Sequence, residues 1–112
     1  MPGSYFTSGP DGLHPQPHAH GPWSEEMLHG RLLGALAARA AEAVGAAEGF
    51  VGARLTVDLF KVAPMAPVQV DAAIVRQGRR IRVADARVRC EGHEVARASA
   101  VFLQRGTHPP GT

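Results

Sequence analysis

Cysteine, lysine and aromatic residues are all scarce in this sequence of 112 residues. The single cysteine, Cys90, can form neither an internal disulfide nor a zinc site made of several thiolates. Aromatic residues make up 5% of the chain, which leaves little from which to build a base-stacking platform. Eleven of the twelve basic residues are arginine, and ten acidic residues reduce the net charge to +2. This composition argues against a nucleic-acid partner.

Long apolar runs are missing as well. No stretch approaches the ~20 apolar residues of a membrane span, and residues 1–5 show neither the basic nor the apolar region of a secretory signal. Hydrophobic residues nevertheless reach 45% and charged residues 20%, as in folded soluble domains. We therefore expect one globular domain in the cytoplasm, with no membrane partner and enough chain to bury a core without disulfides or metals.

The chain divides by composition into three segments. Residues 1–22, rich in Gly, Pro and His, predict a short strand over residues 4–8, a turn at residues 9–12 and then a loop or irregular hairpin. Residues 23–104 carry the main domain, and residues 105–112 read as a flexible tail or linker.

One long helix is predicted first in the main domain. Ser24 is a plausible N-cap, and residues 27–47 are mostly strong helix formers. Apolar residues recur every fourth position and predict an amphipathic stripe. It comprises Leu28, Leu32, Leu36, Ala40 and Val44, with Leu33 and Ala37 beside them. Gly30 and Gly34 inside this pattern indicate close backbone packing or a ligand.

Four strands are predicted after the helix, at residues 50–62, 68–76, 81–90 and 94–104. Tight turns near residues 77–79 and 91–92 make the last three a meander, whereas Pro64 and Pro67 interrupt pairing after the first. The even face of the last strand carries three alanines and a phenylalanine, which suits a face where a helix lies close. The resulting α+β layout is a hotdog fold, with one long central helix wrapped by a curved antiparallel sheet of about five strands. Another α+β sandwich is also permitted.

Five strings of residues occur in a characteristic order and spacing. They are GPW at 21–23, HGRLLGALAARA at 29–40, ARLTVDLFKVAPM at 53–65, VRQGRR at 75–80 and EVARA at 94–98. Together they resemble the N-terminal half of the acyl-CoA thioesterase II-like proteins of the thioesterase-like superfamily. The resemblance covers roughly residues 23–104 and implies a hotdog fold and fatty acyl-CoA thioesters as substrate class. Members typically carry two hotdog units, so it also implies that this chain is one half of a pair.

Thioester hydrolysis needs a water, a base and donors for the developing oxyanion. Hotdog thioesterases place a His-Gly-Gly-like motif at the start of the central helix, where backbone N–H groups are free. The matching residues are His29, Gly30 and Arg31, so the resemblance implies that the Gly30 and Arg31 amides bind the thioester carbonyl. The Arg31 side chain would either block an acyl group or pair with a CoA phosphate. Alternatively, His29 and Gly30 only pack the helix start against the sheet.

The catalytic acid is not identified by the sequence. Ala38 stands where one class of single-unit hotdog thioesterases carries an Asp or Glu, nine positions past the histidine, and Glu42 lies a turn further along. In the family resembled here, an Asp-Thr-Gln set sits in the second unit. The catalytic candidates within this chain are His29 and Asp58, although strand alternation favours an outward position for Asp58.

The remaining arginines, histidines and the cysteine are mostly explained without a functional role. Six arginines surround the hairpin between residues 76 and 89, and Arg79 and Arg80 are the best candidates for CoA phosphates. The others are read as a solvated sheet face. The histidines at 14, 18 and 20 have zinc-ligand spacing, but we favour a solvated loop and expect no metal and no cofactor. Cys90 shares the phase of an apolar strand face and is read as a small core residue.

Two hypotheses follow for function. The first is an acyl-CoA thioesterase-like hotdog domain that hydrolyses or binds fatty acyl-CoA thioesters at a dimer interface. The second is a non-catalytic acyl- or CoA-binding module, or a structural half that needs a second unit for activity. Because a single hotdog sheet leaves edges exposed, we expect a homodimer or pairing with a second hotdog unit.

Overall fold

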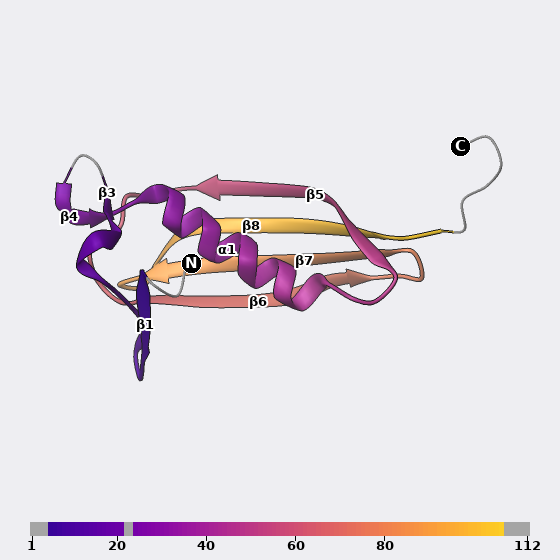
Figure 1. Ribbon diagram of the computed structural model, residues 1–112, viewed down its shortest axis with the longest axis horizontal. Coiled ribbons are helices and arrows are strands. Elements are labelled where there is room, and N and C mark those ends of the chain that lie inside the picture. Colours follow the sequence, from indigo (N-terminus) through magenta and orange to yellow (C-terminus); the bar gives the residue numbers. More distant parts are fainter. Residues whose placement is uncertain (1–4, 22–23, 107–112) are drawn as a thin grey trace.

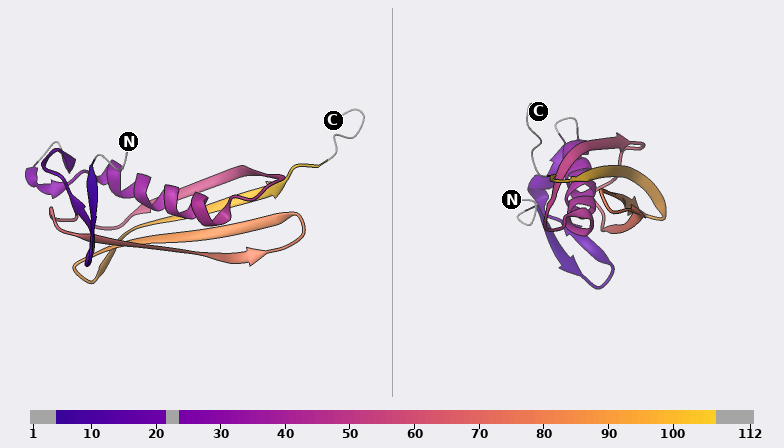
Figure 2. Two further views of the ribbon diagram at one scale, coloured as in Figure 1. Left: turned by 60° about the horizontal axis from the view of Figure 1, so that its bottom comes forward. Right: turned by 90° about the vertical axis from the view of Figure 1, so that its right-hand side faces the viewer.

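A helix of 16 residues, α1 (Gly30–Gly45), lies along one face of a six-stranded antiparallel sheet in the computed structural model, which describes residues 5–21 and 24–106 (Figure 1). The long strands are β5 (Phe50–Leu59), β6 (Val68–Gln77), β7 (Ile81–Cys90) and β8 (His93–Gln104). They lie in the order β6-β7-β8-β5, and Figure 2 shows the sheet curving around the helix. The predicted hotdog fold is confirmed.

The sheet has six strands instead of about five because the N-terminal segment contributes a hairpin. Its strands are β1 (Phe6–Gly9) and β2 (Gly12–Pro15), and β2 joins β6 where Leu13 pairs with Val68. The other short elements are a 3-10 turn at Pro17–Ala19 and a two-stranded sheet of β3 (His20–Gly21) and β4 (Ser24–Leu28). Residue 4 of the predicted first strand, residues 22–23 of the GPW string and residues 107–112 of the predicted tail lie outside the described residues.

The meander β6-β7-β8 follows the predicted turns. The turn between β7 and β8 has positive φ at both central residues, Glu91 and Gly92, as a two-residue hairpin requires. The segment with Pro64 and Pro67 is not a hairpin, because β5 pairs with β8 and lies at the edge of the sheet. This edge position sets the geometry of the site described below.

The helix packs on a floor of small side chains. Ala84, Ala86, Ala96 and Ala98 are fully buried beneath it. The helix residues that are buried are Leu33, Ala37, Ala41 and Gly45. Leu33 and Ala37 of the predicted stripe are thus buried, but its centre was wrong by one position, since Leu32, Leu36, Ala40 and Val44 are half-buried beside the core. Because the alanines of the sheet are small, the helix packs close to the sheet, and its own small residues Ala37, Ala41 and Gly45 are buried there.

The predicted helix start was also wrong. Ser24 does not cap a helix; it begins strand β4, and its hydroxyl accepts the Glu26 N–H at 3.1 Å. Strand β4 is fixed by distant backbone partners, because the Leu28 N–H donates to Ala63 O at 2.8 Å and the Met65 N–H donates to Glu26 O at 2.9 Å. These tertiary bonds override the local helix propensity of residues 24–28. Among the described residues, no helix combines the length and apolarity needed to cross a membrane.

Candidate active site at the helix N-terminus

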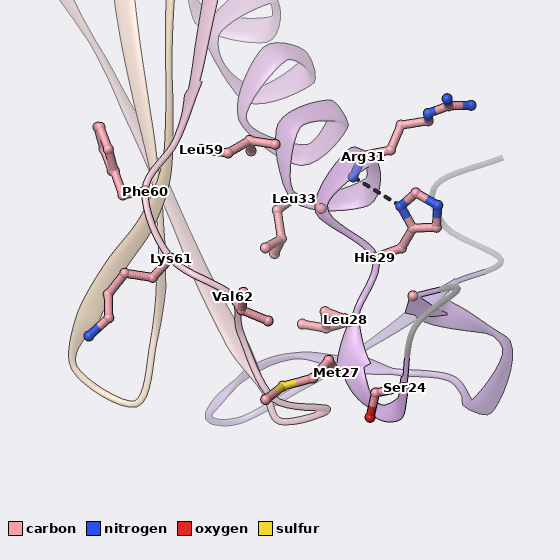
Figure 3. A pocket seen from close by; sticks show the side chains of 12 residues that line it. Ser24, Met27, Leu28, His29, Arg31, Leu33, Leu59, Phe60, Lys61 and Val62 are labelled. Atoms are coloured by element: carbon pink, nitrogen blue, oxygen red, sulfur yellow. Dashed lines mark hydrogen bonds between the residues drawn. The ribbon is translucent and has the colours of Figure 1, made fainter.

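A cavity of about 520 Å³ opens at the N-terminal end of α1 (Figure 3). The start of the helix, strand β4 and the segment after β5 surround it, and its lining residues are Gly21, Ser24, Met27, Leu28, His29, Gly30, Arg31, Leu33, Leu59, Phe60, Lys61 and Val62. Most of these residues are apolar, and Val62 is 70% exposed. The cavity therefore has a mostly apolar lining and opens to solvent on the side of β5.

His29 is the N-cap of the helix. Its Nδ1 accepts the Arg31 N–H at 3.1 Å, and its carbonyl oxygen accepts the N–H groups of Leu32 and Leu33. An accepting Nδ1 assigns the ring proton of a neutral His29 to Nε2. Figure 3 shows the His29 ring and the Arg31 side chain turned away from the apolar interior of the cavity.

Gly30 carries the one backbone donor of this first turn that has no hydrogen-bond partner among the described residues. Gly30 and Arg31 were the expected oxyanion donors. Because the Arg31 N–H donates to His29, only the Gly30 N–H of this pair is available to a ligand. A free N–H at a helix N-terminus attracts a carbonyl oxygen or an anion. The cavity therefore offers one polar anchor beside an apolar interior.

Replacing His29 by alanine removes this cap and should lower the free energy of unfolding by about 1 kcal/mol. His29→Asn should restore most of that loss, because asparagine is among the best N-caps. Urea unfolding of the three proteins measures this difference. If His29→Ala leaves the stability unchanged, the Nδ1 contact is not a cap.

The two helix glycines permit close approach of β5. A Cβ atom on Gly30 would lie 3.4 Å from Leu59 Cδ1, and one on Gly34 would lie 3.2 Å from Val57 Cγ1. Gly34 is thus packed tightly against β5, whereas the distance at Gly30 is that of an ordinary van der Waals contact and Gly30 also lines the cavity. Leu59 is therefore the residue of β5 that lies beside Gly30.

Asp58 does not line this cavity. It pairs with Arg97 on the outer face of the sheet, whereas its neighbours Val57 and Leu59 pair with the buried residues Ala98 and Ala96. Among the residues that the structure describes, the lining includes the cations Arg31 and Lys61 but no Asp or Glu. The described part of the cavity therefore offers no carboxylate that could act as a base.

Arg79 and Arg80 lie in the turn between β6 and β7, at the opposite end of the sheet from the cavity (Figure 1). The Gln104 N–H donates to Arg80 O, and the Phe60 N–H donates to Val95 O beside the cavity. Val95 and Gln104 are separated by nine strand positions, or about 30 Å. One chain does not bring these arginines and the cavity together.

Three of the other four arginines of this hairpin have structural partners. Arg89 contacts Asp71 at 2.5 Å and Arg87 lies 3.7 Å from Glu94, on the outer face of the sheet. Arg82 points inward instead, where its Nε donates to Gly45 O at 2.8 Å and caps the C-terminus of α1. The sequence signal for this cap is the phase of Arg82, which matches the buried residues Ala84 and Ala86.

The three N-terminal histidines have separate surroundings. His14 contacts the Asp11 carboxylate at 2.5 Å. The His18 ring lies 4.8 Å from the Tyr5 ring, and His20 Nδ1 lies 2.8 Å from Gly21 O. Among the residues that the structure describes, no three His, Cys, Asp or Glu side chains gather as a metal site would require.

Cys90 is 2% exposed and belongs to the hydrophobic core. Burial raises the pKa of its thiol, and the nearby Glu91 carboxylate raises it further. A thiol of this kind is a poor nucleophile.

A second cavity, of about 380 Å³, was not predicted. It lies between the later half of α1 and the N-terminal half of β5, and its lining includes Ala38, Arg39, Glu42, Ala53, Arg54 and Leu55. A bulge between Gly52 and Arg54 marks this end of β5. The two cavities therefore open at opposite ends of the same edge strand.

Residues 19–103 match the family described as acyl-CoA thioesterase N-terminal domain. No curated protein sequence matches the chain significantly. Solved structures agree in fold. A Bacillus halodurans protein solved with CoA is 24% identical with a TM-score of 0.65, and the match covers 81% of this chain and 63% of that one.

Two further structures give the same result. A conserved protein from Pseudomonas aeruginosa is 23% identical with a TM-score of 0.66, over 82% of this chain and 76% of that one. A hypothetical thioesterase from Streptococcus pneumoniae, solved with coenzyme A, is 18% identical with a TM-score of 0.68, over 93% of this chain and 87% of that one.

Proposed function

The chain belongs to the acyl-CoA thioesterase N-terminal domain family, and on this premise we propose that it binds a fatty acyl-CoA thioester in the cavity at the start of α1. We propose further that it hydrolyses the thioester only when a second hotdog unit completes the site. The observation that carries this proposal is the unpartnered Gly30 N–H at the mouth of an apolar cavity.

Each part of an acyl-CoA has a suitable counterpart at this cavity. The Gly30 N–H is placed to bind the thioester oxygen, where negative charge develops during hydrolysis. Leu28, Leu33 and Val62 offer an apolar surface for the acyl chain. Arg31 and Lys61 at the rim suit the CoA phosphates. CoA in the Bacillus halodurans and Streptococcus pneumoniae structures supports a ligand of this chemistry.

The open side of the cavity favours a homodimer or a second hotdog unit. Leu59, Phe60 and Val62 are each more than half exposed on the side where β5 forms the sheet edge. A second unit along this edge would cover them, pair the free edge of β5 and supply groups that the cavity lacks.

One observation favours the non-catalytic alternative, in which this chain only binds an acyl-CoA or completes a partner's site. The described residues that line the cavity include no carboxylate, and the Arg31 N–H is already held by His29. A chain with a donor but no base binds a thioester without activating water.

Hydrolysis and calorimetric binding of a short and a long acyl-CoA test the proposal. Gly30→Val places a branched side chain where a Cβ already lies 3.4 Å from Leu59, so binding should weaken about tenfold or more. Gly106→Val is the matched control, because a Cβ there meets nothing within 4 Å.

Equal binding by both variants would place the ligand elsewhere. Binding that is sensitive to Gly30→Val, but without turnover by the dimer, would establish the non-catalytic alternative. No binding and no turnover would reject both.

A further inference from the structure

The outer face of the sheet, which points away from α1, divides into a charged half and an apolar half. The charged half lies toward the β7–β8 turn, where Arg89 pairs with Asp71 and Arg97 pairs with Asp85. Toward the β6–β7 turn the same face carries aliphatic residues of three strands. They form an apolar patch that comprises Val51, Ile81, Val83, Val101 and Leu103. None of these five residues lines the cavity at Gly30.

Strand register brings the patch together. Val83 lies opposite Val101, and Leu103 lies opposite both Ile81 and Val51. The alternate residues of β7 and β8 are buried beneath the helix, so the residues of the patch point away from it. Leu103 is 43% exposed, and no element of the described chain lies over this face (Figure 2). Contiguous apolar surface of this kind marks an interaction site.

Two arginines flank the apolar patch. Arg76 of β6 lies opposite Val83, and Arg54 of β5 lies opposite Val101, so one row across the sheet consists of two valines between two arginines. Strands lie about 4.8 Å apart, which places Arg54 and Arg76 about 14 Å from one another. Further arginines follow where the sheet ends, namely Arg79, Arg80 and Arg105. None of the five belongs to an ion pair among the described residues.

We propose that the apolar patch docks an amphipathic helix of a partner protein that carries Asp or Glu on both sides of its apolar stripe. A helix is about 10–12 Å across, which fits between two arginines about 14 Å apart. With the stripe on Val83 and Val101, carboxylates on the two flanks of the helix would meet Arg76 and Arg54 in charge-assisted hydrogen bonds.

The length of the patch sets how much of the helix it contacts. From Arg76 to Arg80 the sheet extends four residues, or about 13 Å, which corresponds to two or three helical turns. The inference goes beyond acyl-CoA binding, because the patch lies at the opposite end of the sheet from the Gly30 cavity (Figure 1). A second unit along the β5 edge would lie beside this face and leave it open.

Charge and shape favour a helix over two other occupants. A second copy docked by the same patch would bring the arginines of both copies together, and like charges oppose such a contact. A flat bilayer would touch only the crest of a sheet that curves around its helix (Figure 2). A single acidic helix along the strands meets both the valines and the arginines.

Peptide binding tests the proposal. The probe is a fluorescein-labelled helical peptide of about 18 residues, long enough to hold a helix, with leucines in one stripe and Glu on both flanks. A second peptide carries Lys at the flanking positions. Fluorescence anisotropy should show saturable binding of the Glu peptide and binding of the Lys peptide at least tenfold weaker.

Reversing the charges of the protein should reverse this preference. Arg54→Glu/Arg76→Glu should weaken binding of the Glu peptide and strengthen binding of the Lys peptide, each about tenfold. A gain of affinity cannot arise from unfolding. Leu103→Asp should weaken both peptides, because it places a charge in the apolar patch. Arg39→Glu is the control, since Arg39 is exposed on α1 and should affect neither peptide.

Equal binding of the two peptides, or no change on charge reversal, would overturn the proposal. Sedimentation with phosphatidylserine-containing vesicles in the absence of peptide binding would overturn it in favour of a lipid surface. Self-association that Leu103→Asp abolishes would overturn it in favour of a second copy. Acyl-CoA binding is measured separately, so a failure of the proposed function is distinguished from a failure of this docking site.

Discussion

Replacing Phe102 by alanine is expected to lower the free energy of unfolding by about 3–5 kcal/mol, a large share of what a domain of this size has. Phe102 is 5% exposed and fills the space between β8 and the last turn of α1. A Cβ atom added to Gly45 would collide with its ring. Gly45→Ala alone should therefore lower the stability by about 1–3 kcal/mol through overpacking.

The double variant separates this packing contact from a general loss of stability. In Phe102→Ala the ring is gone, so the methyl group of Gly45→Ala no longer collides with it, keeps only a 3.1 Å approach to Ala84 Cβ, and partly fills the cavity. The double variant should be more stable than the sum of the two single effects predicts, by about 1 kcal/mol or more. Urea unfolding of the four proteins measures the coupling. Additive losses would mean that the helix end does not touch Phe102.

The alternation of apolar and polar residues was sufficient to predict those strands whose pairing partners lie close in the sequence. The alternation in residues 68–104 predicted the three strands of the meander, and Glu91-Gly92 predicted their last turn, because a two-residue hairpin depends on local backbone conformation. The alanines of β8 predicted the face beneath the helix, since only small residues let a helix approach closely.

Elements fixed by distant partners were not predictable in this way. Strand β4 consists of residues with good helix propensity, and its extended form depends on hydrogen bonds to Ala63 and from Met65. The helix consequently starts five residues later than Ser24 would suggest, with His29 as its cap. A single sequence contains no signal for bonds of this range.

The same distinction applies to the site. The His29–Arg31 string located the cavity through its family resemblance, but the Nδ1 contact that occupies the Arg31 amide depends on the side-chain rotamer. The cavity beside Glu42 depends on the bulge near Gly52 and on the level at which β5 crosses the helix. Counted along the helix, Glu42 lies one turn beyond Ala38, the position where one class of single-unit hotdog thioesterases carries its acid.

Leu55→Asp is expected to break the assembly and, with it, thioester hydrolysis. Leu55 is 54% exposed in the single chain, so the isolated fold should tolerate the change with a stability difference of about 0.5 kcal/mol or less. In a dimer formed along the β5 edge, the same side chain would be buried once in each copy. Each unpaired carboxylate buried there costs about 1–3 kcal/mol, so the dissociation constant should rise about a hundredfold.

Val75→Asp is the matched control for Leu55→Asp, because Val75 is 57% exposed but lies on β6, three strands from the proposed interface. Sedimentation equilibrium should show a monomer only for Leu55→Asp, and its hydrolysis rate should recover as protein concentration rises toward the new dissociation constant. Recovery with concentration is the decisive observation, since damage within one chain would not respond to concentration. A Leu55→Asp protein that remains a dimer would place the interface on a surface other than β5.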